Sequence, residues 1–174
     1  GGFASYAVAP AEAVHPLPSG FGFDEGCTLL GSYETAYHCL VTCGKLKKGE
    51  SVLINGASGS TGLAAVQIAK LLGATVIATG RSDAKLAVVK EQGADHVINI
   101  CDEAGTTGVR RFRDEVKALT GGVGVDVVYD GVGGEISLES LRCLQFGGRF
   151  LIVGWAATPF VAKGKGQRGA PNAN

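Results

Sequence analysis

The sequence has no excess of charge of either sign and no long apolar run. Lysine plus arginine and aspartate plus glutamate each number 16 among 174 residues, so the net charge is zero. No apolar stretch approaches the roughly 20 residues that cross a bilayer. Without a positive field we expect neither nucleic acid nor a membrane surface as a partner. We expect a soluble, cytoplasmic protein, with an organellar form left open.

Metal-binding and disulfide-forming patterns are also lacking. The five cysteines are scattered and none stands in a C-x-x-C pair, which predicts free intracellular thiols. The three histidines, His15, His38 and His96, are widely spaced and have no second ligand at a suitable distance along the chain. There is no Ser-His-Asp or paired-carboxylate arrangement. We therefore predict no metal site, and the sequence assigns no catalytic residue.

Glycine is abundant, with 28 residues, and from residue 51 onward short β-branched runs alternate with amphipathic stretches. This alternation predicts repeated strand–helix units, whose parallel strands need crossover helices on both faces of the sheet. The expected strands are 51–55, 75–79, 96–99, 125–129 and 149–153, and the expected helices are 60–72, 82–92, 108–119 and 135–144. The predicted fold is a doubly wound parallel α/β domain of the Rossmann type.

The flanking segments differ from this central part. Residues 3–8 alternate weakly like a strand, and two prolines make 15–18 an extended linker. Residues 24–43 are expected to be helical, in two pieces broken near Gly31. We divide the chain into a linker at 1–22, a dinucleotide-binding domain at 23–160 and a Gly-, Lys- and Pro-rich loop or disordered tail at 161–174.

The most informative stretch is the glycine-rich turn between the first predicted strand and the first predicted helix. Gly59 would let the backbone approach a diphosphate, Gly62 would let the helix pack close to the strand, and Ala57 replaces the first glycine of the usual G-x-G-x-x-G pattern. Ser60 and Thr61 add hydroxyl donors where the helix points free N–H groups at the anion. The alternative is a turn without a ligand, but the surrounding strand–helix repeats favour a dinucleotide.

The end of the second predicted strand decides which dinucleotide is favoured. An NAD site usually places an acid there on the ribose 2′-hydroxyl. This chain has Gly80, followed by Arg81, Ser82 and Lys85, which form a pocket for a 2′-phosphate. NADP(H) is therefore the predicted cofactor. The competing interpretation makes Asp83 the ribose acid, although an acid at this position also suits the start of a helix.

At this point the residues resemble the medium-chain dehydrogenase/reductase superfamily, in particular its zinc-independent quinone oxidoreductase and enoyl reductase branch. The similarity covers nearly the whole chain. The motifs that carry it are 1–6 (GGFASY), 17–20 (LPSG), 35–37 (TAY), 52–59 (VLINGASG), 93–95 (GAD), 130–134 (DGVGG) and 148–150 (GRF). The resemblance implies that Gly131, Val132 and Gly154 lie near the nicotinamide and its ribose, and that Thr35 lies at its inner edge.

Two departures from the family pattern matter for the site. Zinc alcohol dehydrogenases of the family place a ligand cysteine four residues before the threonine that matches Thr35, where this chain has Gly31. Cys27, one helical turn away, is expected to be a packed thiol. The branch also often has a tyrosine near the 2′-phosphate where this chain has Ile100, so the phosphate pocket depends mainly on Arg81 and Lys85.

The family's GroES-like catalytic domain is largely missing, so we expect the chain to be a fragment that is inactive alone. The predicted function is the cofactor-binding part of an NADPH-dependent oxidoreductase. Its small-molecule substrate would be a quinone, an enone or an enoyl thioester. The alternative is a non-catalytic NADP(H)-binding module, either a redox sensor or a structural, crystallin-like protein. The exposed edge of the last predicted strand points to a homodimer through the sheet edge in the intact protein.

Overall fold

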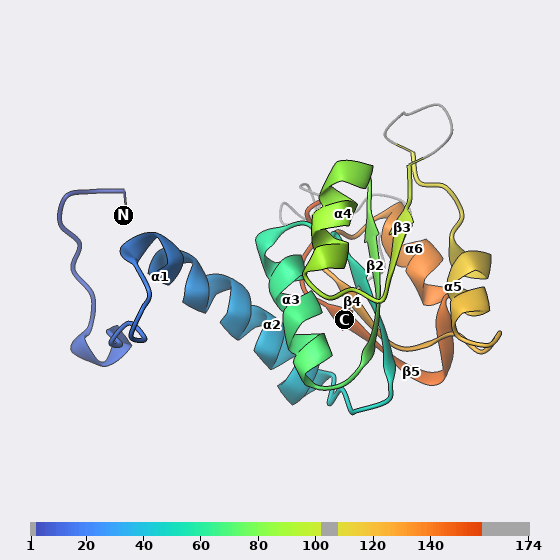
Figure 1. The fold of residues 1–174 in the computed structure, drawn as a ribbon, viewed down its shortest axis with the longest axis horizontal. Helices are drawn as coiled ribbons and strands as arrows, with labels where there is room; N and C mark the ends of the chain where they lie inside the picture. Colours follow the sequence, from blue (N-terminus) through green and yellow to red (C-terminus); the bar gives the residue numbers. More distant parts are fainter. Residues whose placement is uncertain (1–2, 102–107, 158–174) are drawn as a thin grey trace, which may run out of the picture.

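A five-stranded parallel sheet forms the centre of the computed structural model, which describes residues 3–101 and 108–157 (Figure 1). The strand order is β3-β2-β1-β4-β5, and every neighbouring pair is parallel. The strands are β1 (Ser51–Asn55), β2 (Thr75–Gly80), β3 (His96–Asn99), β4 (Val125–Asp130) and β5 (Leu144–Ile152). The predicted parallel α/β fold is confirmed.

Helices cover both faces of this sheet. The helices are α1 (Phe23–Leu29), α2 (Thr35–Tyr37), α3 (Ser60–Leu71), α4 (Asp83–Glu91), α5 (Arg113–Leu119) and α6 (Glu135–Leu141). Side chains of α2, α3 and α4 share one hydrophobic cluster, whereas those of α5 and α6 share another. Figure 1 shows α3 and α4 on one side of the sheet and α5 and α6 on the other.

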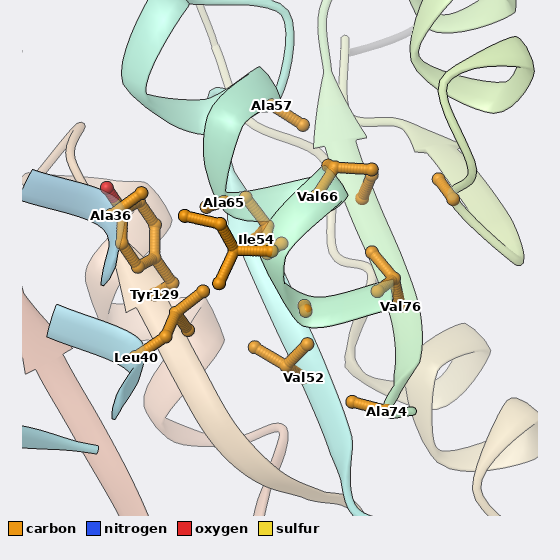
Figure 2. Packing of buried hydrophobic residues seen from close by; sticks show 14 of the residues in the cluster. Ala36, Leu40, Val52, Ile54, Ala57, Ala65, Val66, Ala74, Val76 and Tyr129 are labelled. Carbon is orange, nitrogen blue, oxygen red and sulfur yellow. The ribbon is translucent and has the colours of Figure 1, made fainter. Parts of the chain in front are cut away.

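The central strand β1 is buried on both faces. Val52, Leu53 and Ile54 have no exposed surface. Val52 and Ile54 point into the cluster beneath α3, where Figure 2 shows Ile54 beside Tyr129, and Leu53 points into the opposite cluster. A strand covered on both faces needs a continuous apolar run rather than an alternating one, as this sequence has.

The segment before the sheet differs from the prediction in two ways. Residues 3–8 form no strand, and Phe3 and Val8 are fully exposed, because no described strand lies beside them to supply hydrogen bonds. The predicted break near Gly31 is also wrong. The chain stays helical from Phe23 to Cys43, with wider π-helical turns at Leu30–Glu34 and His38–Cys43. This helical rod extends away from the sheet (Figure 1).

Several helix and strand boundaries after residue 100 differ from the predicted ones. The helix predicted from residue 108 begins at Arg113, because Val109 pairs with Cys101 in an antiparallel bridge and keeps the chain extended. The last strand begins at Leu144 rather than 149, because Leu144 already pairs with Val125 before a bulge interrupts the register. The helix predicted to reach residue 144 accordingly ends at Leu141.

Several remaining expectations concern the surface and the tail. In the described part of the chain no helix is both long and apolar enough to span a membrane. All five cysteines are free, and Cys27, expected to be packed, is exposed. The predicted tail at 161–174 lies outside the described residues, and the division of the chain into 1–22, 23–160 and 161–174 stays a prediction.

An ion pair joins helix α3 to the residue that precedes the edge strand β3. Lys70 Nζ lies 2.8 and 2.9 Å from the two carboxylate oxygens of Asp95, and the Val76 amide donates to the same carboxylate at 2.7 Å. Burial alone would raise the pKa of Asp95, but the hydrogen bonds from Lys70 and Val76 outweigh it and lower the pKa. The carboxylate therefore stabilises the fold above the ordinary pKa of an aspartate, and this contribution is lost as the pH falls through the lowered value.

We predict that Asp95→Asn lowers the free energy of unfolding by about 1 kcal/mol at pH 7, because the Lys70 ammonium loses its charged partner. The difference from the wild type should shrink as the pH falls below about 4, where the carboxylate becomes protonated. Urea denaturation across this pH range measures both effects. Glu91→Gln, on an exposed acid of α4, is the control; an Asp95→Asn deficit independent of pH would contradict the assignment.

Candidate cofactor-binding site

The glycine-rich turn between β1 and α3 presents open backbone donors. Gly56 adopts a positive φ of 63° and accepts a hydrogen bond from the Gly59 amide at 3.0 Å. Helix α3 begins at Ser60, with Gly59 as its N-terminal cap and no side chain on its first amides. The first N–H groups of a helix have no intrahelical acceptor, so these amides can bind an anion.

Gly62 lets α3 lie against the turn. A Cβ atom at this position would stand 2.8 Å from the Ala57 Cα, and closer still to the carbonyl oxygen of Gly56. Both obstacles are backbone atoms, which cannot move aside as a flexible side chain can. By contrast, a Cβ at Gly59 would meet only the Gly56 oxygen at 3.4 Å. The close packing of helix on turn therefore depends on Gly62.

A pocket of about 350 Å³ opens beside this turn. It joins the glycine-rich turn to the end of β2, and residues after β3 and β4 complete its walls. Its lining residues are Gly56, Ser58, Gly59, Gly80, Arg81, Ser82, Lys85, Ile100, Val132 and Ile136. The fold thus brings together two motifs that stand about 20 residues apart in the sequence, at the carboxyl end of the strands where open α/β sheets bind ligands.

The β2 end of the pocket is cationic. Arg81 directly follows the strand, and Ser82 caps α4 by accepting the Lys85 amide at 3.5 Å. Neither the Arg81 guanidinium nor the Lys85 ammonium has a carboxylate partner within residues 3–101 and 108–157. The carboxylate of Asp83 instead accepts a hydrogen bond from Asn99 at 2.7 Å, and Asp83 does not line the pocket. This end is suited to a phosphate.

The opposite side of the site is built on the turn after β4. The buried carboxylate of Asp130 accepts the amides of Val132 and Gly133 at 3.0 and 3.3 Å, and it also accepts the Ser137 hydroxyl. The Gly154 amide donates to the Asp130 carbonyl at 3.3 Å, and a Cβ at Gly154 would lie 3.2 Å from the Gly131 oxygen. Gly131, Val132 and Gly154 are therefore side by side.

Thr35 lies apart from these residues, on α2. Its hydroxyl donates to the carbonyl of Gly31 at 2.8 Å, and it does not line the pocket. Its neighbour Ala36 packs into the core (Figure 2). The two tyrosines beside it, Tyr33 and Tyr37, are 37% and 56% exposed. The Tyr33 hydroxyl donates to the Gln67 side chain on α3.

Two thiols and one phenol near the core have raised pKa values. Burial raises the pKa of the Cys39 thiol, and burial together with Glu139 raises that of Cys143 to about 12. Burial also raises the pKa of Tyr129, whose hydroxyl has no hydrogen-bond partner among the described residues. These groups hold their protons at neutral pH. Within the described ranges, no three metal-ligating side chains form a cluster.

Sequence reasoning missed the polar layer beneath the pocket. The Asn55 side chain donates to the Ser140 hydroxyl and accepts from the Thr79 hydroxyl, each at 2.9 Å. This chain of hydrogen bonds links β2, β1 and α6, and it fixes the strand end from which the glycine-rich turn starts. The signal available in the sequence was that Asn55 and Thr79 are polar residues within apolar strands. Their partners lie 24 and 85 residues away, which no local pattern reveals.

We predict that Gly62→Ala weakens the binding of NADPH and NADH alike, by roughly tenfold or more, because the added methyl pushes α3 off the turn. Fluorescence titration of the two dinucleotides measures this effect. Gly31→Ala is the matched control, since a Cβ there meets nothing within 4 Å. Unchanged affinity in Gly62→Ala would show that the close packing does not shape the site.

Known proteins similar to this chain are dehydrogenases, reductases and polyketide synthases. A family model described as zinc-binding dehydrogenase matches residues 60–165. The human quinone oxidoreductase is 34% identical over 158 residues, which are 91% of this chain and 46% of that protein. A highly reducing polyketide synthase of Aureobasidium melanogenum is 39% identical over 159 residues, which are 90% of this chain but 7% of that protein. The chain thus spans less than half the length of these relatives.

Solved structures of similar proteins also match this chain over part of their own length. The mycobacterial protein Rv1454c in complex with NADPH matches with a TM-score of 0.78 and 33% identity, over 86% of this chain and 44% of that one. The CurK enoyl reductase matches with a TM-score of 0.73 and 36% identity, over 82% and 40%. At these identities the fold and the cofactor-binding half of the relatives are shared.

Proposed function

The chain belongs to the zinc-binding dehydrogenase family of the medium-chain dehydrogenase/reductase superfamily, and on this premise we propose that it is the NADP(H)-binding part of an oxidoreductase. The observation that carries the proposal is a pocket with a glycine-rich helix start at one end and two cations without carboxylate partners in the described ranges at the other. The NADPH complex of a similar mycobacterial protein supports the choice of cofactor.

The residues present fit an NADP(H) molecule. The first amides of α3, at Ser60, Thr61 and Gly62, would hold the diphosphate. Ala57 and Gly59, whose amides donate within the protein, would shape the turn around it. Arg81, Ser82 and Lys85 would hold the 2′-phosphate. Gly131, Val132 and Gly154 would lie along the nicotinamide and its ribose, with Thr35 at the inner edge. When bound, the cofactor supplies the hydride, and the protein binds and orients it.

We propose further that the reaction does not depend on zinc, although the family description refers to zinc. Gly31 stands where zinc alcohol dehydrogenases have a ligand cysteine, and within the described ranges no three metal-ligating side chains come together. Cys27 is exposed, and its thiol donates to the Asp24 carbonyl. We therefore propose a zinc-independent reductase that acts on quinones or on α,β-unsaturated carbonyls, including enoyl thioesters. The quinone oxidoreductase and enoyl reductase relatives support this substrate class.

One observation favours a second candidate, a binding module without catalysis, such as a redox sensor or a structural protein. At the turn after β4 the Asp130 carboxylate is occupied by hydrogen bonds from Val132, Gly133 and Ser137. Tyr129 packs into the core (Figure 2). A reductase can do without a donor here if water or another part of the protein supplies the proton. The two candidates therefore differ in turnover and not in cofactor binding.

Two further proposals concern the setting of the protein. Strand β5 has β4 as its sole neighbour in the part of the sheet that the structure describes, and a free edge of this kind can pair with the same edge of a second copy. We propose a homodimer of this type for the intact protein. The five free thiols support a reducing compartment such as the cytoplasm.

We predict that Arg81→Ala weakens NADPH roughly ten- to hundredfold and NADH less than about twofold, because charge-assisted hydrogen bonds to the 2′-phosphate are lost. Calorimetric titration of both cofactors measures the ratio. Arg111→Ala removes the same charge from an exposed arginine outside the pocket and should change neither affinity. Equal losses for NADPH and NADH in Arg81→Ala would remove the phosphate assignment.

We also predict which form of the protein oxidises NADPH. Because the chain covers 46% of the human quinone oxidoreductase, we expect it to bind NADPH but to oxidise it slowly with any acceptor. A chimaera with the remaining part of that relative should oxidise NADPH with a quinone, an enone or an enoyl thioester, followed by the loss of NADPH absorbance. Tight binding without turnover in the chimaera would favour the non-catalytic module.

A further inference from the structure

The cationic end of the pocket has an acid directly beside it that does not enter it. Asp83 stands two residues from both Arg81 and Lys85, at the first position of α4. In the structure its Oδ1 instead accepts a hydrogen bond from the Asn99 Nδ2 at 2.7 Å. Asp83 is missing from the pocket lining, whereas Arg81, Ser82 and Lys85 are all part of it.

Asn99 is itself held in one orientation. It ends β3 in register with Gly80, the residue before Arg81. Its Oδ1 accepts the Cys101 amide at 3.0 Å, and its carbonyl oxygen accepts the Arg110 Nε at 2.5 Å. Because the side-chain oxygen faces an N–H donor, the NH₂ group must face Asp83. A flipped amide would set oxygen against carboxylate and NH₂ against N–H.

The position of the Asp83 carboxylate decides the charge of the pocket. If it turned toward Arg81 or Lys85, the carboxylate would occupy hydrogen-bond donors that a 2′-phosphate needs, and it would repel the phosphate. A ribose hydroxyl carries no charge and would even gain an acceptor, as in an NAD site. The same side chain would thus favour NADH in one orientation and permit NADPH in the other.

We propose that Asn99 is a specificity-determining residue, which holds the Asp83 carboxylate out of the pocket and so keeps Arg81 and Lys85 free for the 2′-phosphate. This inference rests on the proposed function, because it presupposes that NADP(H) binds in this pocket. It assigns a role in cofactor selection to a residue that ends a strand and does not line the pocket.

The test is a double-mutant cycle on the 174-residue chain, with NADPH and NADH titrated against the wild type, Asn99→Ala, Asp83→Asn and the double variant. Asn99→Ala should reduce the preference for NADPH by roughly fivefold, because a released carboxylate opposes the phosphate. Asp83→Asn should keep the preference, and the double variant should restore it. The effect of Asn99→Ala should also shrink at 1 M salt, where charges are screened within about 3 Å.

Each other outcome overturns the inference in a recognisable way. An unchanged preference in Asn99→Ala would show that Asp83 needs no restraint. A loss that the double variant does not restore would mean that Asn99 acts by supporting the backbone at Cys101. Weaker NADH binding in Asp83→Asn would make Asp83 the ribose acid. If the wild type does not prefer NADPH, the proposed function itself is wrong. The wild-type titrations are therefore carried out before those of any variant.

Discussion

The site depends on one steric constraint, the packing of the start of α3 against the turn that leaves β1. Only a residue without a Cβ fits at Gly62, because the backbone of Gly56 and Ala57 fills the space that a side chain would need. This contact aims the free amides of the first helical turn at one point beside the sheet. The remaining parts of the pocket are arranged around that point, since β2 and β4 flank β1 and end at the same edge.

The two ends of the pocket differ in charge. At the β2 end, Arg81 and Lys85 are left without carboxylate partners in the described residues, while the nearby acid Asp83 is bound by Asn99. At the β4 end, the acid Asp130 is buried, and its carboxylate is satisfied by backbone amides and Ser137. Both carboxylates are thus held by hydrogen bonds within the protein, and neither lines the pocket.

The sequence predicted those features that depend on neighbouring residues. The run 51–55 indicated a strand buried on both faces, the glycines at 59 and 62 indicated the turn and the helix start, and Arg81 after Gly80 indicated the cationic end. Features that depend on distant partners were missed. The antiparallel bridge of Cys101 with Val109 delays α5 to Arg113, and the Asn99–Asp83 bond joins residues 16 positions apart. The continuous helix through Gly31 was also missed. A glycine inside a helix costs only about 1 kcal/mol of stability and need not end the helix.

A crystal structure of the chain soaked with NADPH would show whether the cofactor occupies this pocket. We expect the diphosphate at the amides that open α3 and the 2′-phosphate within hydrogen-bond distance of Arg81 and Lys85. Electron density for the nicotinamide should lie along Gly131, Val132 and Gly154. A cofactor bound elsewhere, or a 2′-phosphate that points into solvent away from Arg81, would contradict the account.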